Sequence, residues 1–225
     1  MKNRTILLSA LLIVISAACT VQVPAAEKKI ELVIEPGKNW NSTIRIGFIP
    51  IKKPPQIAAW IETEEGDYAA TITVTESSSK QKWIGAPEGG RPESLPVWSH
   101  AKNSAAANVD AAASATPKTG LIAEQTGDIL IPGKRYRILI EVNTSFDYND
   151  TWPKNAKEGE INFSGINGQP SVIYEAYFTA GESSTVILQA AGQGSLDGSN
   201  GNIIKNLNGL TTALTIIKSA KLNLR

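Results

Sequence analysis

The chain contains few residues of the types that usually carry enzyme chemistry. Its 225 residues include one cysteine, Cys19, one methionine, Met1, and one histidine, His100. A zinc, copper or iron–sulfur site needs several thiolate or imidazole ligands, and this composition does not supply them. His100 could act as a base with Ser99 or Ser94, but no Gly-x-Ser-x-Gly turn is present, and a nucleophile and its base must meet in space. We therefore expect a surface histidine, no catalytic residues and no metal site.

The cysteine follows the kind of segment that directs export. A basic start precedes an apolar run over 6–18, which ends in small residues directly before Cys19. The run is shorter than the ~20 residues of a membrane-spanning helix, and its size and flanks are typical of a signal peptide. The Ser-Ala-Ala-Cys sequence resembles a lipoprotein signal, which implies that Cys19 is lipidated and anchors the chain in a membrane. The open alternative is ordinary cleavage near Ala25 or Ala26.

These features predict three parts: a signal peptide at 1–18, a lipidated tether at 19–29 and one folded domain at 30–225. Without the signal peptide, Lys and Arg fall from 22 to 20 against 21 Asp and Glu, so the net charge is near −1. A nucleic-acid partner is not expected, because such partners require a basic surface. We expect an extracytoplasmic protein, in the periplasm or on the cell surface.

One stretch of small residues presents a hydroxyl suited to covalent attachment. Its sequence is Asp-Ala-Ala-Ala-Ser-Ala-Thr over 110–116. The stretch resembles the sequence recognised by periplasmic flavin transferases, which join flavin mononucleotide (FMN) to a threonine through a phosphoester bond. The resemblance implies that Thr116 is the acceptor and that Asp110, Ser114 and Ala115 are recognised by the transferase. The open alternative is a short alanine-rich helix at Ser104–Ala113 that ends in an ordinary turn.

A second polar stretch could gather oxygen ligands for calcium. It contains Asp147, Asn149 and Asp150, with Glu158 and Glu160 further along. The spacing does not match the twelve-residue loop that places calcium ligands at fixed positions. Because Asx residues are also common in turns, we interpret the stretch as a solvated loop.

The sequence predicts a series of short β-strands, which would position the residues discussed above. In Tyr136–Val142 apolar and charged residues alternate, which indicates a half-buried strand. Segments 57–64 and 68–75 flank Glu-Gly-Asp, a hairpin turn. The alternation in Thr43–Ile51 predicts one strand that directs Ile44, Ile46 and Phe48 inward. The remaining expected strands are 30–34, 121–131, 172–179, 185–191 and 213–224.

About eight or nine short strands and no long amphipathic helix are typical of an all-β fold. Two long segments, 85–120 and 147–170, interrupt the strands and are rich in turn residues. Trp60 is expected in the core. Trp98 and Trp152 are expected to pin the two long loops to the domain, and the alternative is that they frame a shallow platform for flavin or another ligand. We predict a single antiparallel β-sandwich with two long loops and one short helix.

Several segments resemble a family of small predicted periplasmic proteins, known mainly as a domain of unknown function. The resemblance covers about residues 30–180, and Leu-Pro-Val-Trp-Ser is its most specific part. It implies an immunoglobulin-like sandwich, an envelope location and an association with flavin- and iron-linked membrane redox systems. The matching segments, in order, are Gln56–Glu62, Arg91–Ser99, Val109–Lys118 and Gly133–Ile138.

The expected function is that of a lipid-anchored, non-enzymatic binding or redox-accessory module. Its specific form is a carrier of covalent FMN on Thr116, loaded by a flavin transferase and exchanging electrons with a membrane reductase. The alternative is a structural or adhesive surface lipoprotein that carries no cofactor.

Overall fold

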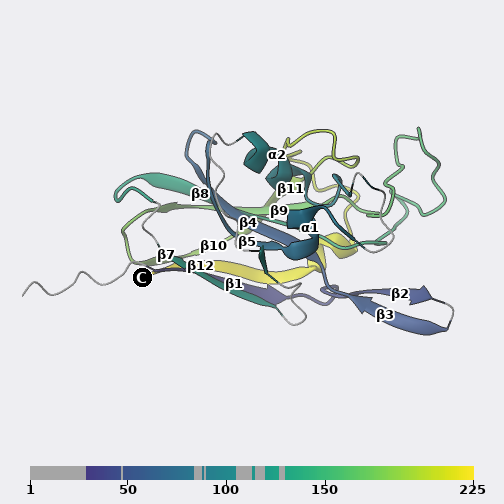
Figure 1. Cartoon of the computed structure of the whole chain (residues 1–225), viewed down its shortest axis with the longest axis horizontal. Helices are drawn as coiled ribbons and strands as arrows, with labels where there is room; N and C mark the ends of the chain where they lie inside the picture. The colour runs from purple at the N-terminus through teal and green to yellow at the C-terminus, as the bar shows by residue number, and fades with distance from the viewer. Residues whose placement is uncertain are drawn as a thin grey trace, which may run out of the picture.

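The computed structural model describes residues 29–46, 48–83, 88, 90–104, 113–114, 120–126 and 130–225. Two β-sheets pack face to face in this part of the chain (Figure 1). The four-stranded sheet has the order β10 (Ser184–Ile187), β12 (Ile217–Leu224), β1 (Lys29–Pro36) and β7 (Leu121–Thr126). The six-stranded sheet has the order β11 (Gln189–Gln193), β9 (Val172–Thr179), β8 (Arg135–Asn143), β4 (Gln56–Thr63), β5 (Tyr68–Thr75) and β6 (Ala113–Ser114). The β-sandwich expected from the strand pattern is confirmed.

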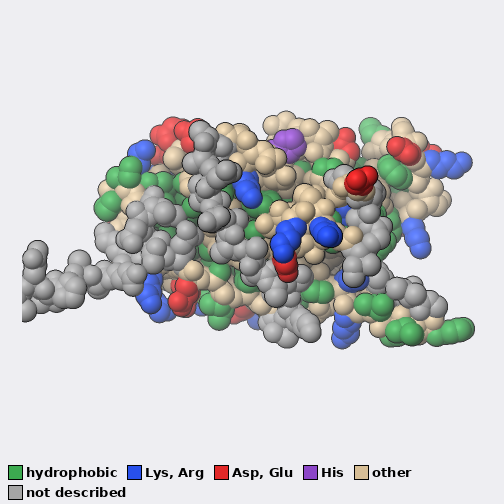
Figure 2. All heavy atoms as spheres, in the orientation of Figure 1, with side chains coloured by type: hydrophobic (Ala, Val, Ile, Leu, Met, Phe, Trp, Pro, Cys, Tyr) green, Lys and Arg blue, Asp and Glu red, His purple; other side chains and the backbone are tan. Residues whose placement is uncertain are grey.

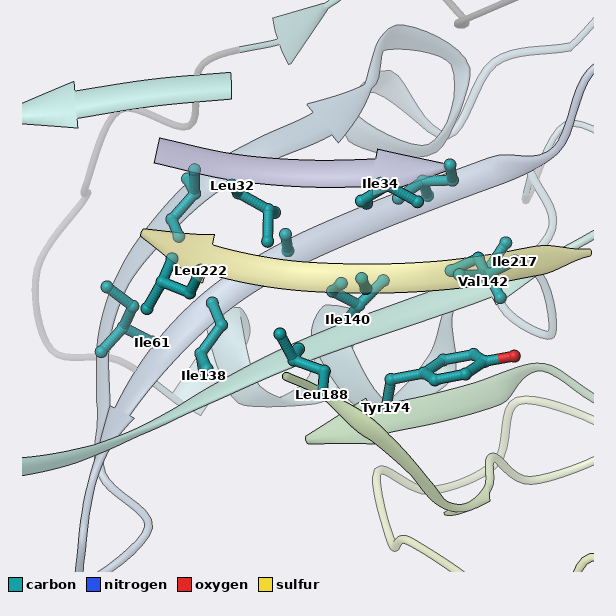
Figure 3. Close-up of a cluster of buried hydrophobic side chains, with 14 of the residues drawn as sticks. Leu32, Ile34, Ile61, Ile138, Ile140, Val142, Tyr174, Leu188, Ile217 and Leu222 are labelled. Atoms are coloured by element: carbon teal, nitrogen blue, oxygen red, sulfur yellow. The ribbon is translucent and has the colours of Figure 1, made fainter. Parts of the chain in front are cut away.

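Apolar side chains from both sheets fill the space between them (Figure 3). The six-stranded sheet contributes the residues of β8 that the alternating pattern directs inward, Ile138, Ile140 and Val142, and all three are fully buried. Leu32 and Leu222 face them from the four-stranded sheet. Burying such side chains contributes about 1.5–3 kcal/mol each, so this layer holds the two sheets together.

The segment expected as one inward-facing strand, Thr43–Ile51, is instead a hairpin, and that expectation was wrong. Strands β2 (Ser42–Ile46) and β3 (Ile49–Lys53) pair antiparallel as a separate two-stranded sheet, with Ile46 opposite Ile49. Phe48 consequently lies fully exposed at the turn.

The strand expected at 185–191 also differs, because it divides at Leu188. Residues before Leu188 form β10 and pair with β12, whereas residues after it form β11 and pair with β9. The Leu188 side chain is buried in the core. One apolar run therefore crosses from one sheet to the other and closes the sandwich at this side.

The helices are short and lie outside the sheets. They are α1 (Glu76–Lys80), α2 (Pro96–Ser104) and the 3-10 helix η2 (Thr212–Thr215). The helix expected at Ser104–Ala113 falls mainly on residues outside the described part; Ser104 ends α2, and Ala113 belongs to β6. No helix in the described ranges has the length and apolar composition needed to cross a membrane.

The two ends of the sandwich differ. Lys29 and Arg225 exchange backbone hydrogen bonds of 3.0 Å, so the described N-terminus and the C-terminus share one end. The β2–β3 hairpin and the long loop 144–171 lie at the opposite end (Figure 1). Gln56 directly follows the hairpin, and Asn143 directly precedes the loop. These two residues pair across β4 and β8, so the hairpin and the loop leave the sheet at the same end. The hairpin and the long loop therefore lie at the end opposite Lys29 and Arg225.

Candidate functional site

Most residues expected to carry chemistry lie outside the described part of the chain. This applies to Cys19, the expected lipid attachment site, and to Asp110, Ala115 and Thr116 of the expected flavin attachment site. Ser114 is described only in its backbone, which forms β6 with Ala113.

Strand β6 places the expected flavin segment at the edge of the six-stranded sheet. Ala113 and Ser114 pair in parallel with Val74 and Thr75 of β5. The Thr75 hydroxyl donates to Gln56 Oε1 over 2.9 Å, and the Ser78 hydroxyl donates to the same oxygen over 2.8 Å. Because this hydrogen-bonded group is buried, the edge that receives β6 is held firmly.

The His100 ring contacts a backbone carbonyl oxygen. The side chain is exposed, and its Nε2 lies 3.1 Å from the carbonyl oxygen of Gly198. The Ser94 hydroxyl is buried and has no hydrogen-bond partner. The expectation of a surface histidine agrees with this geometry.

Three polar residues of the loop 144–171 accept hydrogen bonds from other groups of the protein. Asp147 Oδ1 accepts a hydrogen bond from the Thr212 hydroxyl over 2.5 Å. Asn149 Oδ1 accepts from the backbone of Trp152, and Glu160 accepts from the backbone of Lys157. Among the described residues, no three acidic, histidine or cysteine side chains gather closely enough to hold a metal ion. This arrangement agrees with the interpretation of the stretch as a loop.

The most unusual ionisable group is Glu141, one of the charged residues that alternate with the inward-facing apolar residues of β8. Helix α2 covers the outer face of β8, so Glu141 is completely buried. Its carboxylate accepts hydrogen bonds from the backbone N–H of Val97 (3.2 Å) and of Trp98 (2.8 Å), and from the Ser171 hydroxyl (2.6 Å). Burial raises the pKa of Glu141 to about 7, although the three hydrogen bonds lower it.

A glycine closes this site from the other side. A Cβ atom on Gly194 would lie 2.4 Å from the Ser171 hydroxyl and 3.0 Å from a carboxylate oxygen of Glu141. Only glycine permits so close an approach of the backbone without displacing these groups. Glu141 is thus sealed between the sheet, α2 and the segment after β11, and we assign it a structural role.

Two tryptophans pack beside Glu141 on the same outer face. The Trp98 indole N–H donates to the Thr71 hydroxyl over 2.9 Å, and the Trp60 indole N–H donates to Glu62 over 2.8 Å. Both rings are buried in a second apolar cluster with Leu95 and Leu139. Trp60 is therefore buried as expected, but under α2 rather than between the sheets. Trp98 pins the first long loop, as expected.

Arg91 ties the two long loops together. Its guanidinium is buried and donates to Glu93 (3.2 Å), to Ser145 (2.8 Å) and to Asn167. It also lies 5.4 Å from the centre of the Trp83 ring, a cation–π contact. Because Ser145 and Asn167 are distant from Arg91 in sequence, the sequence pattern gave no signal for this network. The network stiffens the base of the loop 144–171.

The end of the domain opposite the termini carries exposed apolar side chains. At the hairpin turn Phe48 is 102% exposed and Ile49 is 67% exposed. On the long loop Ile161 is 99% exposed and Phe163 is 37% exposed. Figure 2 shows hydrophobic side chains at the projecting tip of the hairpin. Large apolar side chains gathered at one end mark an interaction surface more often than isolated ones do. We call Phe48, Ile49, Ile161 and Phe163 the apolar end.

Comparison of the chain with protein-family models, curated proteins and solved structures finds no match. The buried hydrogen bonds of Arg91 and Glu141 hold the long loops together and α2 against the sheet. The apolar end holds the two most exposed large apolar side chains among the described residues, Phe48 and Ile161.

Proposed function

We propose that this protein is an exported, lipid-anchored and non-enzymatic binding module of the cell envelope, with its binding surface at the apolar end. One observation carries the proposal: the apolar end lies opposite the end that holds Lys29 (Figure 1). A lipid on Cys19 would hold the domain by the Lys29 end. The apolar end would then be free to meet a partner.

The interior of the domain suits a rigid mount. Arg91 holds the base of the long loop, and the buried hydrogen bonds of Glu141 hold α2 against the sheet. Held loops lose less conformational entropy on binding than free ones do, which favours affinity. The proposed role is therefore presentation of a preorganised surface.

Site-specific photo-crosslinking in intact cells tests this function. A photoreactive residue at Phe48 or Ile161 should form adducts with a partner molecule. The matched control is Ile187, which is 63% exposed on the edge strand β10 but lies outside the apolar end. Adducts at Phe48 and Ile161 that are missing at Ile187 support the proposal, and equal labelling at all three positions contradicts it.

A carrier of covalent FMN on Thr116 is the second candidate function. It is favoured by the position of β6, which ends at Ser114, two residues before Thr116, on an edge of the sheet. An edge strand is accessible to a transferase, and the sandwich would fix the position of the flavin while the cofactor supplied the redox chemistry. A membrane reductase would then be the electron partner. A structural or adhesive lipoprotein without a cofactor is the alternative if flavin is not attached.

A further inference from the structure

The β2–β3 hairpin combines an apolar tip with a basic stem. Residues 42–53 contain Arg45, Lys52 and Lys53 and no Asp or Glu. Phe48 and Ile49 lie exposed at the turn, and the side chains of Lys52 and Lys53 are exposed on β3. The partner of such a hairpin must accept apolar side chains at the tip and negative charge along the stem.

The spacing along β3 matches the depth of a membrane interface. Lys52 and Lys53 lie three and four residues after Ile49, which is about 10–13 Å at about 3.3 Å per residue. Interfacial segments bury their apolar side chains about 5–10 Å into the boundary between headgroups and acyl chains. With Phe48 and Ile49 at that depth, the lysine ammonium groups would reach the phosphate layer, because lysine extends its charged end toward polar surroundings.

The shape of the hairpin favours a lipid partner over a folded protein. The hairpin is a separate two-stranded sheet that projects from the sandwich (Figure 1). The described cavities of about 230 and 250 Å³ are lined by other segments. Folded protein partners bind through closely matched surfaces that bury about 800 Å² on each side. A narrow tip inserts more readily into a fluid layer.

We propose that the β2–β3 hairpin inserts Phe48 and Ile49 into an anionic lipid surface, with Lys52 and Lys53 bound to the lipid phosphates. This inference rests on the proposed binding function and names the partner of part of the apolar end. Anionic lipid is required because the stem carries only positive charge. The rest of the apolar end, on the long loop, is mixed in charge, with Lys157 close to Glu158 and Glu160.

A tryptophan at the tip reports insertion directly. The full-length Phe48→Trp protein, purified from its envelope, is mixed with vesicles of phosphatidylglycerol and brominated phosphatidylcholine. The emission of the native tryptophans is removed by subtracting the wild-type spectrum. This background should change little with lipid, because four of the five native tryptophans (Trp40, Trp60, Trp98 and Trp152) are at most 8% exposed. The emission of the new tryptophan should shift to shorter wavelength and be quenched by bromine. Anchoring through the N-terminus alone does not change this reporter.

Two variants and one vesicle control define the result. Lys52→Gln with Lys53→Gln, in the reporter protein, should weaken binding about 25-fold, because each cation near an anionic surface contributes about fivefold. Ile187→Trp, on exposed β10, should remain unquenched. Vesicles of brominated phosphatidylcholine alone should give no shift.

Three results overturn the inference. The first is a Phe48→Trp emission that stays solvent-like with anionic vesicles. The second is equal quenching in neutral and anionic vesicles, which removes the role of the lysines. The third is crosslinking from position 48 to a protein in cells, while vesicles do not change the emission of the Phe48→Trp protein. This outcome supports the proposed binding function and rejects lipid as the partner.

Discussion

Replacement of Glu141 by Gln should change how the stability of the protein depends on pH. Burial raises the pKa of this carboxyl group from 4.5 to about 7 in the folded state. Below pH 4.5 both states hold the proton. Between pH 4.5 and 7 the unfolded chain releases it, whereas the folded protein keeps it. The free energy of unfolding therefore falls as the pH rises through this window, and the loss is complete above the folded pKa.

The size of the effect follows from the pKa shift. Each pKa unit corresponds to about 1.4 kcal/mol, so a rise from 4.5 to about 7 corresponds to a loss of ~3 kcal/mol. Gln at this position cannot ionise and resembles the protonated acid. The free energy of unfolding of Glu141→Gln, measured relative to wild type, should thus increase by ~3 kcal/mol between about pH 4.5 and pH 7.5.

Urea unfolding followed by tryptophan fluorescence, over a series of pH values, measures this difference. Glu64→Gln provides the matched control, because it removes one exposed carboxylate near the end of β4. Gln leaves one of the N–H groups of Val97 and Trp98 without an acceptor, which costs about 1–3 kcal/mol. Because this cost is the same at every pH, it lowers the free energy of unfolding of the variant by a constant amount and does not change its pH dependence. A difference that stays constant with pH, or that moves in favour of wild type, would refute the reasoning. It would mean that the three hydrogen bonds outweigh the cost of burying the charge.

The other predictions concern anchoring, packing and the flavin segment. Cys19→Ala should release the protein from the membrane fraction or block its processing; an unchanged fraction and mature mass, measured by cell fractionation and intact-mass spectrometry, would contradict the lipid anchor. Trp60→Ala should lower the free energy of unfolding by about 3–5 kcal/mol, because it leaves a cavity under α2; a loss below about 1 kcal/mol in denaturant titration would show that the face repacks. Co-expression with a flavin transferase should yield a band with flavin fluorescence on a denaturing gel. Thr116→Ala should abolish the band and Asp110→Ala should weaken it, and a dark wild-type band beside a flavinylated control protein rejects the carrier role.

Local patterns in the sequence were sufficient to predict the β4–β5 hairpin, although they predicted the β2–β3 hairpin as one strand. The hairpin of β4 and β5 turns at Glu65-Gly66-Asp67, where Gly66 has a φ of 98°, a value that glycine adopts without strain. The faces of β8 also follow its alternation of apolar and charged residues. Side-chain alternation has a period of two in every strand, so it is independent of the rest of the fold.

Contacts between distant segments decided what the pattern could not. Glu141 looked like an outward-facing residue, and only the packing of α2 made it a buried acid. Phe48 continued the apolar alternation of its segment, yet the chain turned beside it and left it exposed at the apolar end. Leu188 lay within one apolar run that the two sheets divide between them. Alternation shows which residues of a strand share a face. Which segment covers each face depends on parts of the chain that are far away in sequence. This covering sets the burial, the pKa and the exposure of each side chain.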